Sequence, residues 1–242
     1  MRAIAAYFAA LLKRMAEVLG PPALRMIISG PSGSGKGILT SEVLLKHLRG
    51  KFKKIYYFSA SALHDGNLEP LKEYCEKHLG QGKKDPCLYE TWDDAVVQRI
   101  LDRQAAVVEY MKQKGDKRKF HIAIICDDFA NERRVVRGGI LEKLFLMGRH
   151  INVSTFVLTQ YYRLLSPAIR TNATLLACFR MRNIKDLQAI LEENSALVPA
   201  DRLKEMYDRA TAKPFGFLLI RLTETDPAKT FFGSFETRLV PT

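Results

Sequence analysis

The chain has 242 residues, with 38 Lys and Arg against 26 Asp and Glu, which leaves a formal charge of +12 at pH 7. That length suits one domain with a full core and is short for two enzymatic domains, and 47% hydrophobic with 26% charged residues excludes a disordered chain. The positive charge favours a polyanionic partner, because neutralising phosphates releases condensed counterions, although a basic protein without a nucleic-acid role would have the same charge.

The N-terminal segment is apolar but short. Residues 3–12 cannot span a bilayer, and Lys13 and Arg14 end the run. Apolar residues within 4–19 fall on one helical face, so we expect an amphipathic docking helix over residues 1–20, with an interfacial membrane helix as the alternative. The cysteines lack C-x-x-C spacing and predict reduced thiols in an intracellular protein: Cys75, Cys87, Cys126 and Cys178.

The first half of the chain predicts a strand, a glycine loop and a helix. The apolar run LRMIISG, 24–30, leads into GPSGSGKG, and an amphipathic helix is expected over 37–48. A second strand is expected over 53–61, followed by a polar stretch to about Pro86 with one short helix. Thr91 and Asp94 predict a capping box for a helix that runs to about Lys114. Its apolar stripe is Val97, Ile100, Leu101, Val107, Val108 and Met111.

The second half continues the alternation of strands and helices. The expected elements are a strand over 121–129, a helix over 138–150, strands over 151–160 and 174–181, two helices within 184–212, and strands over 215–222 and 231–239. We expect the last two strands to pair as an edge hairpin. The alternation predicts a three-layer α/β domain with a mainly parallel sheet. We expect one domain over 1–242, with its core at 24–242.

The glycine loop matches seven of the eight positions of the phosphate-binding pattern G-x-x-x-x-G-K-[ST]. Its glycines let successive amide N–H groups point at phosphate oxygens, and Lys36 supplies a mobile charge for the β and γ phosphates. A plain glycine turn between strand and helix is the alternative interpretation. The predicted nucleotide-binding residues are Gly30, Pro31, Ser32, Gly33, Ser34, Gly35, Lys36, Gly37 and Ile38.

Two acids and an amide end the next apolar strands. Asp127 is the candidate for the Mg²⁺ shell, and Asp128 is the candidate for orienting or deprotonating the attacking water. An N-cap pair for the next helix is the alternative for these two acids. Gln160 ends the following strand and is a candidate for contacting the γ phosphate or that water, whereas a solvated strand terminus is the plainer interpretation.

At these residues the chain resembles the FtsK/HerA superfamily of DNA-pumping ATPases, with a RecA-like P-loop fold. It is most similar to the genome-packaging ATPases of poxviruses, other large DNA viruses, virophages and virus-like transposons. The residues that carry the resemblance are GPSGSGKG at 30–37, YETWDD at 89–94, IICDDF at 124–129 and GRHINVSTFVLTQ at 148–160.

The resemblance implies a motor that uses ATP and Mg²⁺ to thread double-stranded DNA through a homo-oligomeric ring, pentameric or hexameric, into a capsid. A capsid or portal protein would be its partner, and the host cytoplasm, a virus factory or the virion its location. In such rings a neighbouring subunit supplies an arginine at the γ phosphate. Arg149 is the first candidate for this finger, ahead of Arg133, Arg134 and Arg170. Arg149 also fits a second role, complementing the negative end of the helix over 139–148.

The DNA contacts are not identified by the sequence. KFKK at 51–54, KQKGDKRK at 112–119 and YYR at 161–163 are basic or aromatic, but charge runs between elements are most often solvated turns.

The eighth position of the loop is Gly37 where the resemblance leads one to expect Ser or Thr. We consider two interpretations: a water replaces the hydroxyl on Mg²⁺, which retains waters readily, or the chain binds nucleotide without hydrolysing it. Thr40, a full turn further, is not expected to reach the metal. A P-loop kinase acting on a small metabolite is a third possibility, against which the DD and TQ arrangement argues.

Overall fold

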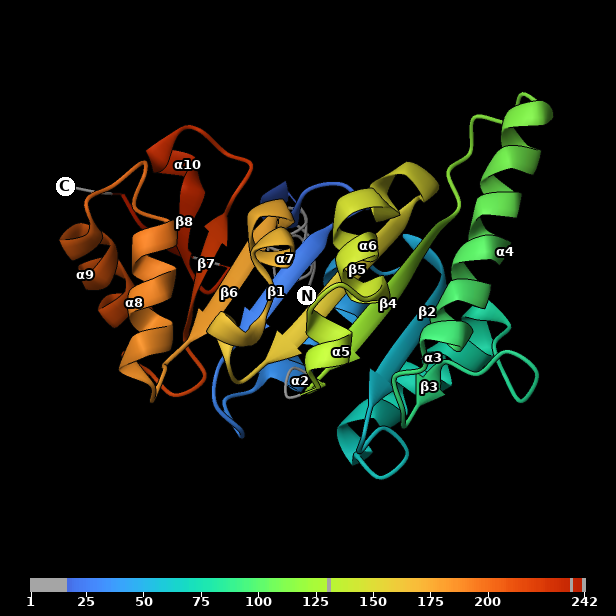
Figure 1. The fold of residues 1–242 in the computed structure, drawn as a ribbon, viewed down its shortest axis with the longest axis horizontal. Helices are drawn as coiled ribbons and strands as arrows, with labels where there is room; N and C mark the ends of the chain where they lie inside the picture. The colour runs from blue at the N-terminus through green and yellow to red at the C-terminus, as the bar shows by residue number, and fades with distance from the viewer. Residues whose placement is uncertain (1–16, 130–131, 236, 241–242) are drawn as a thin grey trace, which may run out of the picture.

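The computed structural model describes residues 17–129, 132–235 and 237–240. The described strands form one nine-stranded sheet in the order β3-β2-β4-β5-β1-β6-β7-β8-β9 (Figure 1). The strands are β1 (Arg25–Ser29), β2 (Phe52–Ser59), β3 (Leu88–Tyr89), β4 (His121–Asp127), β5 (Val153–Thr159), β6 (Leu175–Phe179), β7 (Phe217–Arg221), β8 (Phe231–Gly233) and β9 (Thr237–Arg238).

The sheet is parallel from β3 to β6 and antiparallel from β6 to β9. This confirms the predicted mainly parallel sheet and the pairing of the last two expected strands, since β7 pairs with β8. The expected strand over 231–239 is divided, because the chain turns at Ser234, where φ is 54°, and returns as β9. The short strand β3 was not predicted.

Helices cover both faces of the sheet. The α-helices are α2 (Lys36–Glu42), α3 (Glu69–Leu79), α4 (Asp94–Gln113), α5 (Arg133–Val136), α6 (Ile140–Met147), α7 (Pro167–Asn172), α8 (Ile184–Glu193), α9 (Ala200–Ala210) and α10 (Pro227–Thr230). In Figure 1, α4, α5, α6, α7 and α8 lie in front of the sheet, and α2 and α3 lie behind it. The predicted three layers are therefore present.

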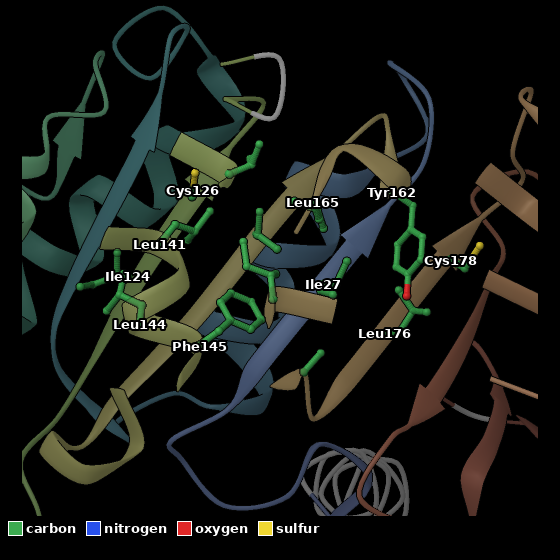
Figure 2. Close-up of a cluster of buried hydrophobic side chains, with 14 of the residues drawn as sticks. Ile27, Ile124, Cys126, Leu141, Leu144, Phe145, Tyr162, Leu165, Leu176 and Cys178 are labelled. Carbon is green, nitrogen blue, oxygen red and sulfur yellow. The ribbon is translucent and has the colours of Figure 1, made fainter. Parts of the chain in front are cut away.

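The central strands are mainly apolar and buried along nearly their whole length, because both faces of the sheet are covered. Along β1, Ile27 packs in the front cluster with α6 and α7, whereas Met26 and Ile28 pack in the rear cluster with α2. Figure 2 shows part of the front cluster, with Phe145 of α6 lying over the strands. All four cysteines are buried, unpaired thiols.

The start of α4 corrects one prediction. Its N-cap is Asp93, whose carboxylate accepts from the backbone N–H of Ala95 and Val96, so Thr91 and Asp94 do not form the capping box. Asp94 instead accepts from the indole N–H of Trp92 at 2.8 Å.

The apolar stripe of α4 is buried only in its first half. Val97, Ile100 and Leu101 are buried, but the helix then extends past the sheet, as Figure 1 shows, and residues 107, 108 and 111 are only partly covered. Gln104 anchors the helix at this point, because its amide donates to the carbonyls of Phe120 at 2.7 Å and Ile151 at 2.9 Å.

The helix after the glycine loop also differs from the expectation. The regular α-helix ends at Glu42 and continues as a π-helical segment, η1 (Val43–His47). Of the helix expected over 1–20, residues 1–16 lie outside the described part, and Val18 and Leu19 are buried in the rear cluster. Within the described residues, no helix combines the length and the apolar character needed to cross a bilayer.

Candidate nucleotide site

Three parallel strands bring the predicted motifs to one edge of the sheet. β1 runs into the glycine loop at Gly30, β4 ends at Asp127, and β5, which lies between them, is followed directly by Gln160. Because the carboxyl ends of parallel strands share an edge, residues separated by up to 130 positions become neighbours. This edge is the lower one in Figure 1.

The glycine loop needs its glycines for two different reasons. A Cβ on Gly30 would lie 2.7 Å from both Phe179 Cβ and Ser34 Oγ, so no side chain fits between the loop and β6. Gly33 and Gly35 have φ of 75° and 101°, a backbone region that costs glycine little. The conformation of the loop therefore depends on glycine at positions 30, 33 and 35.

Lys36 lies inside this loop. Its ammonium donates to the carbonyls of Gly30 at 2.9 Å and Pro31 at 3.2 Å, and the residue is 7% exposed. Burial lowers the pKa of Lys36, while Asp128 and Asp127 oppose that shift. The ammonium thus lies within the loop, and the charges of the two acids act on it.

Asp127, at the end of β4, is an acid whose pKa is raised by its surroundings. Burial raises the pKa of Asp127 to about 6, an effect that the hydrogen bond from Tyr57 and the charge of Lys36 oppose and the charge of Asp128 reinforces. The Tyr57 hydroxyl donates to Asp127 Oδ2 at 2.8 Å. A carboxylate and a hydroxyl oxygen are ligands that suit Mg²⁺, and a cation here would offset the burial of the acid.

Asp128 and Gln160 interact directly. The Gln160 amide donates to Asp128 Oδ2 at 2.6 Å, and Asp128 has φ of 64°, which turns its side chain away from the strand path. The next helix, α5, begins at Arg133, so neither acid occupies an N-cap position and that alternative is wrong. Gln160, at the end of β5, thus contacts a residue at the end of the neighbouring strand β4.

Thr40 and Tyr57 are two hydroxyl-bearing residues to consider in relation to Gly37, which itself has no side chain. Thr40 donates its hydroxyl to the Lys36 carbonyl at 2.9 Å and is fully buried, so it is held within the helix as expected. A Cβ added to Gly37 would lie 3.8 Å from the Tyr57 hydroxyl oxygen. Nothing in its own segment singles out Tyr57, because a tyrosine in an apolar strand is usually a core residue.

A cavity of about 510 Å³ adjoins the loop. Its lining comes from residues 31–34, 180–182 and 211–215, and Arg180, Arg182 and Lys213 make it basic. Phe215 is 67% exposed with φ of 60°, an unusual backbone state for a bulky residue, and its ring lies 3.3 Å from the Cβ position of Gly35. These residues were not predicted, because only the fold brings the end of β6 and the start of β7 beside the loop.

The candidate arginines lie in different settings. Arg149 is exposed in η3 (Gly148–Ile151), before β5 begins, and therefore at the edge opposite the glycine loop of its own chain. It also follows the end of α6, as the helix-end interpretation requires. Arg170 pairs with Glu193 and Arg134 with Glu132. The Arg133 side chain lies outside the described part.

The basic segments are divided between the two edges. Residues 112–119 and Lys53 lie near the far end of α4, where Arg118 pairs with Asp116 and both Lys53 and Arg118 lie over the Phe120 ring. YYR at 161–163 follows β5 at the nucleotide edge, and its Tyr161 is 43% exposed.

Comparison with known proteins identifies a matching protein family. The profile described as the poxvirus A32 protein matches residues 86–210, which is more than half of the chain. No curated protein sequence matches significantly.

Several solved structures share the fold. The genome packaging NTPase B204 from Sulfolobus turreted icosahedral virus 2, in complex with ATP-gammaS, has a TM-score of 0.57 at 19% identity, covering 87% of this chain and 96% of that chain. B204 of Sulfolobus turreted icosahedral virus, described as a DNA-packaging ATPase, has a TM-score of 0.56 at 17% identity, covering 86% and 96%. EssC (ATPases 2 and 3) from Geobacillus thermodenitrificans has 0.54 at 11%, covering 82% and 38%. The fold is therefore that of a P-loop ATPase.

Proposed function

This chain belongs to the family of the poxvirus A32 protein, and we propose that it is an ATP hydrolase that moves double-stranded DNA into a viral or virus-like capsid. The observation that carries this proposal is the meeting of Lys36, Asp127, Asp128 and Gln160 at one sheet edge beside a basic cavity. Similarity of fold to proteins named as genome-packaging NTPases supports it. Residues 24–242 would form the ATPase core of a single domain.

The roles of the residues follow from their places. The backbone of 30–38 and Lys36 would bind the β and γ phosphates, and the cavity at Phe215 would take the nucleoside. Asp127 would hold Mg²⁺, which when bound neutralises charge on the phosphates. Asp128 would accept the proton of the attacking water, with Gln160 fixing the position of its carboxylate.

The wider assembly is part of the proposal. The charge of +12 suits a duplex DNA substrate, and a homo-oligomeric ring would let one chain complete its neighbour's site through Arg149. A capsid or portal protein would receive the ring, inside the infected cell or in the virion.

A second candidate is a nucleotide-binding protein without turnover, which Gly37 favours. Measuring ATP hydrolysis with and without long duplex DNA separates the two. We expect DNA-stimulated hydrolysis in the wild type, loss of nucleotide binding in Lys36→Ala, and bound but unhydrolysed ATP in Asp128→Asn. Lys46→Ala is the control, because Lys46 is an exposed lysine of the following turn that pairs with Glu42. Binding without hydrolysis by the wild type, with and without DNA, would favour the second candidate.

A further inference from the structure

The tyrosine beside Gly37 has a position that packing alone does not require. Tyr57 belongs to β2 and is fully buried, yet its hydroxyl reaches Asp127 Oδ2 at 2.8 Å and lies 3.8 Å from the Cβ position of Gly37. The hydroxyl oxygen is thus the one non-neighbouring atom within 4 Å of the Cβ position of residue 37 among the described residues. Its neighbour Tyr56 faces the other side of the sheet and donates to Asp85 at 3.2 Å.

A hydroxyl at position 37 of this loop pattern would supply an oxygen to Mg²⁺. The Tyr57 hydroxyl has the same chemistry at this place, because it uses its proton toward Asp127 and retains lone pairs. Accepting the roles proposed above for the loop and Asp127, we propose that Tyr57 supplies the hydroxyl oxygen of the Mg²⁺ site that residue 37 lacks.

A metal-binding hydroxyl on Tyr57 also accounts for glycine at position 37. A Cβ there makes only ordinary contact with the Tyr57 oxygen, but a serine Oγ, one bond further out, would compete for the same space and the same acceptor. Two hydroxyls beside one carboxylate are redundant. Gly37 and Tyr57 therefore form a matched pair, and Gly37→Ser alone should gain little.

The test is binding of ATP-gammaS by calorimetry, with Mg²⁺ and with EDTA, to the full chain as wild type, Tyr57→Phe, Gly37→Ser and the double variant. Binding of Mn²⁺ to each nucleotide-saturated protein, followed by electron paramagnetic resonance, gives a readout that does not depend on turnover. Tyr57→Phe preserves the buried ring, and thermal unfolding of the empty proteins checks that the fold is intact. Tyr56→Phe is the matched control on the same strand.

We expect Tyr57→Phe to weaken Mn²⁺ binding at least about tenfold and to reduce the Mg²⁺-dependent gain in nucleotide affinity, while affinity in EDTA is unchanged. Adding Gly37→Ser to Tyr57→Phe should restore both. Wild-type values in Tyr57→Phe, or a large gain from Gly37→Ser in the wild type, would overturn the assignment and favour a water at that position. Failure of the wild type to bind nucleotide at all would instead overturn the proposed function, and the assignment with it.

Discussion

Asp127 shows how one residue can be unfavourable for folding and useful for binding. Its carboxyl is partly buried, and the hydrogen bond from Tyr57 and the charge of Lys36 do not compensate for that burial, so its pKa is about 6 instead of 3.8. The folded protein therefore holds more protons than the unfolded chain between these two values, and this group's contribution to the free energy of unfolding falls as pH rises through that window.

We expect Asp127→Asn to stabilise the empty protein at pH 7.5 by about 3 kcal/mol at most, because it removes a partly buried charge and keeps an acceptor for Tyr57. The gain should vanish near pH 4, where the wild-type carboxyl is protonated. Thermal or urea unfolding from pH 4 to 8 measures it. A stability difference that does not change with pH would contradict this account.

Phe215 is a second residue with unfavourable features that a binding role would explain: a positive φ and an exposed aromatic ring. Stacking of a base on an aromatic ring contributes about 1–3 kcal/mol, so Phe215→Ala should weaken ATP-gammaS binding by at least about fivefold, and Phe215→Trp should preserve it. Tripolyphosphate, which has no base, is the control ligand and should bind both variants like the wild type. Equal losses for both ligands would mean that the substitution disturbs the glycine loop itself.

At the scale of elements, the position of the site is determined by where the strands end. β1, β4 and β5 stop at the same edge, and the segment before β7 lines the cavity beside it, so the site is made of strand ends and loops. α4 takes no part in the site. Its start is capped by Asp93, and Gln104 in its middle anchors it to the backbone just before β4 and β5.

Asp93→Ala should destabilise the protein by about 1 kcal/mol, because the first turn of α4 loses the acceptor for two backbone N–H groups. Thr91→Ala, at an exposed position two residues earlier, should change the free energy of unfolding by less than about 0.5 kcal/mol. Urea unfolding of both variants measures the difference. The opposite ranking would restore the capping box that the sequence predicts.

At the scale of the whole molecule, the nucleotide edge and Arg149 lie at opposite edges of the sheet. Within one chain Arg149 therefore cannot contact the phosphate that the glycine loop would bind. It could contact one only in an assembly that brings the far edge of one subunit to the nucleotide edge of the next, which is the arrangement that the proposed ring requires.

Mixing Arg149→Ala subunits with the wild type should reduce ATP hydrolysis by more than the mutant fraction predicts, because each missing arginine disables a neighbour's site. The same mixing series with Arg202→Ala, an exposed arginine of α9 that pairs with Glu205, should show no such loss. Loss in strict proportion to the Arg149→Ala fraction would support the helix-end role instead.

The sequence by itself determined the local features of this protein. Each of these features lies within one run of consecutive residues: the apolar strands, the glycine loop and the acids at the end of β4. Each can be predicted because it depends on backbone conformation and burial pattern within a single segment. That was enough to predict the α/β fold, its mainly parallel sheet and the candidates Lys36, Asp127, Asp128 and Gln160. The cap of α4 was mistaken even so. Three acceptors, at 91, 93 and 94, lie close together there, and in the structure Asp94 accepts from the indole of Trp92 while Asp93 caps the helix.

The tertiary structure decided what depends on strand order. Tyr57, Phe215 and the arginines of the cavity carry no signal in their own segments, because an aromatic residue in or beside a strand is as common in a core as in a site. Only the pairing of β2 with β4 brings the Tyr57 hydroxyl to Asp127 and Gly37, and only the pairing of β6 with β7 brings Phe215 to the loop. Contacts between residues far apart in the chain follow from the register of the sheet, which no single segment contains.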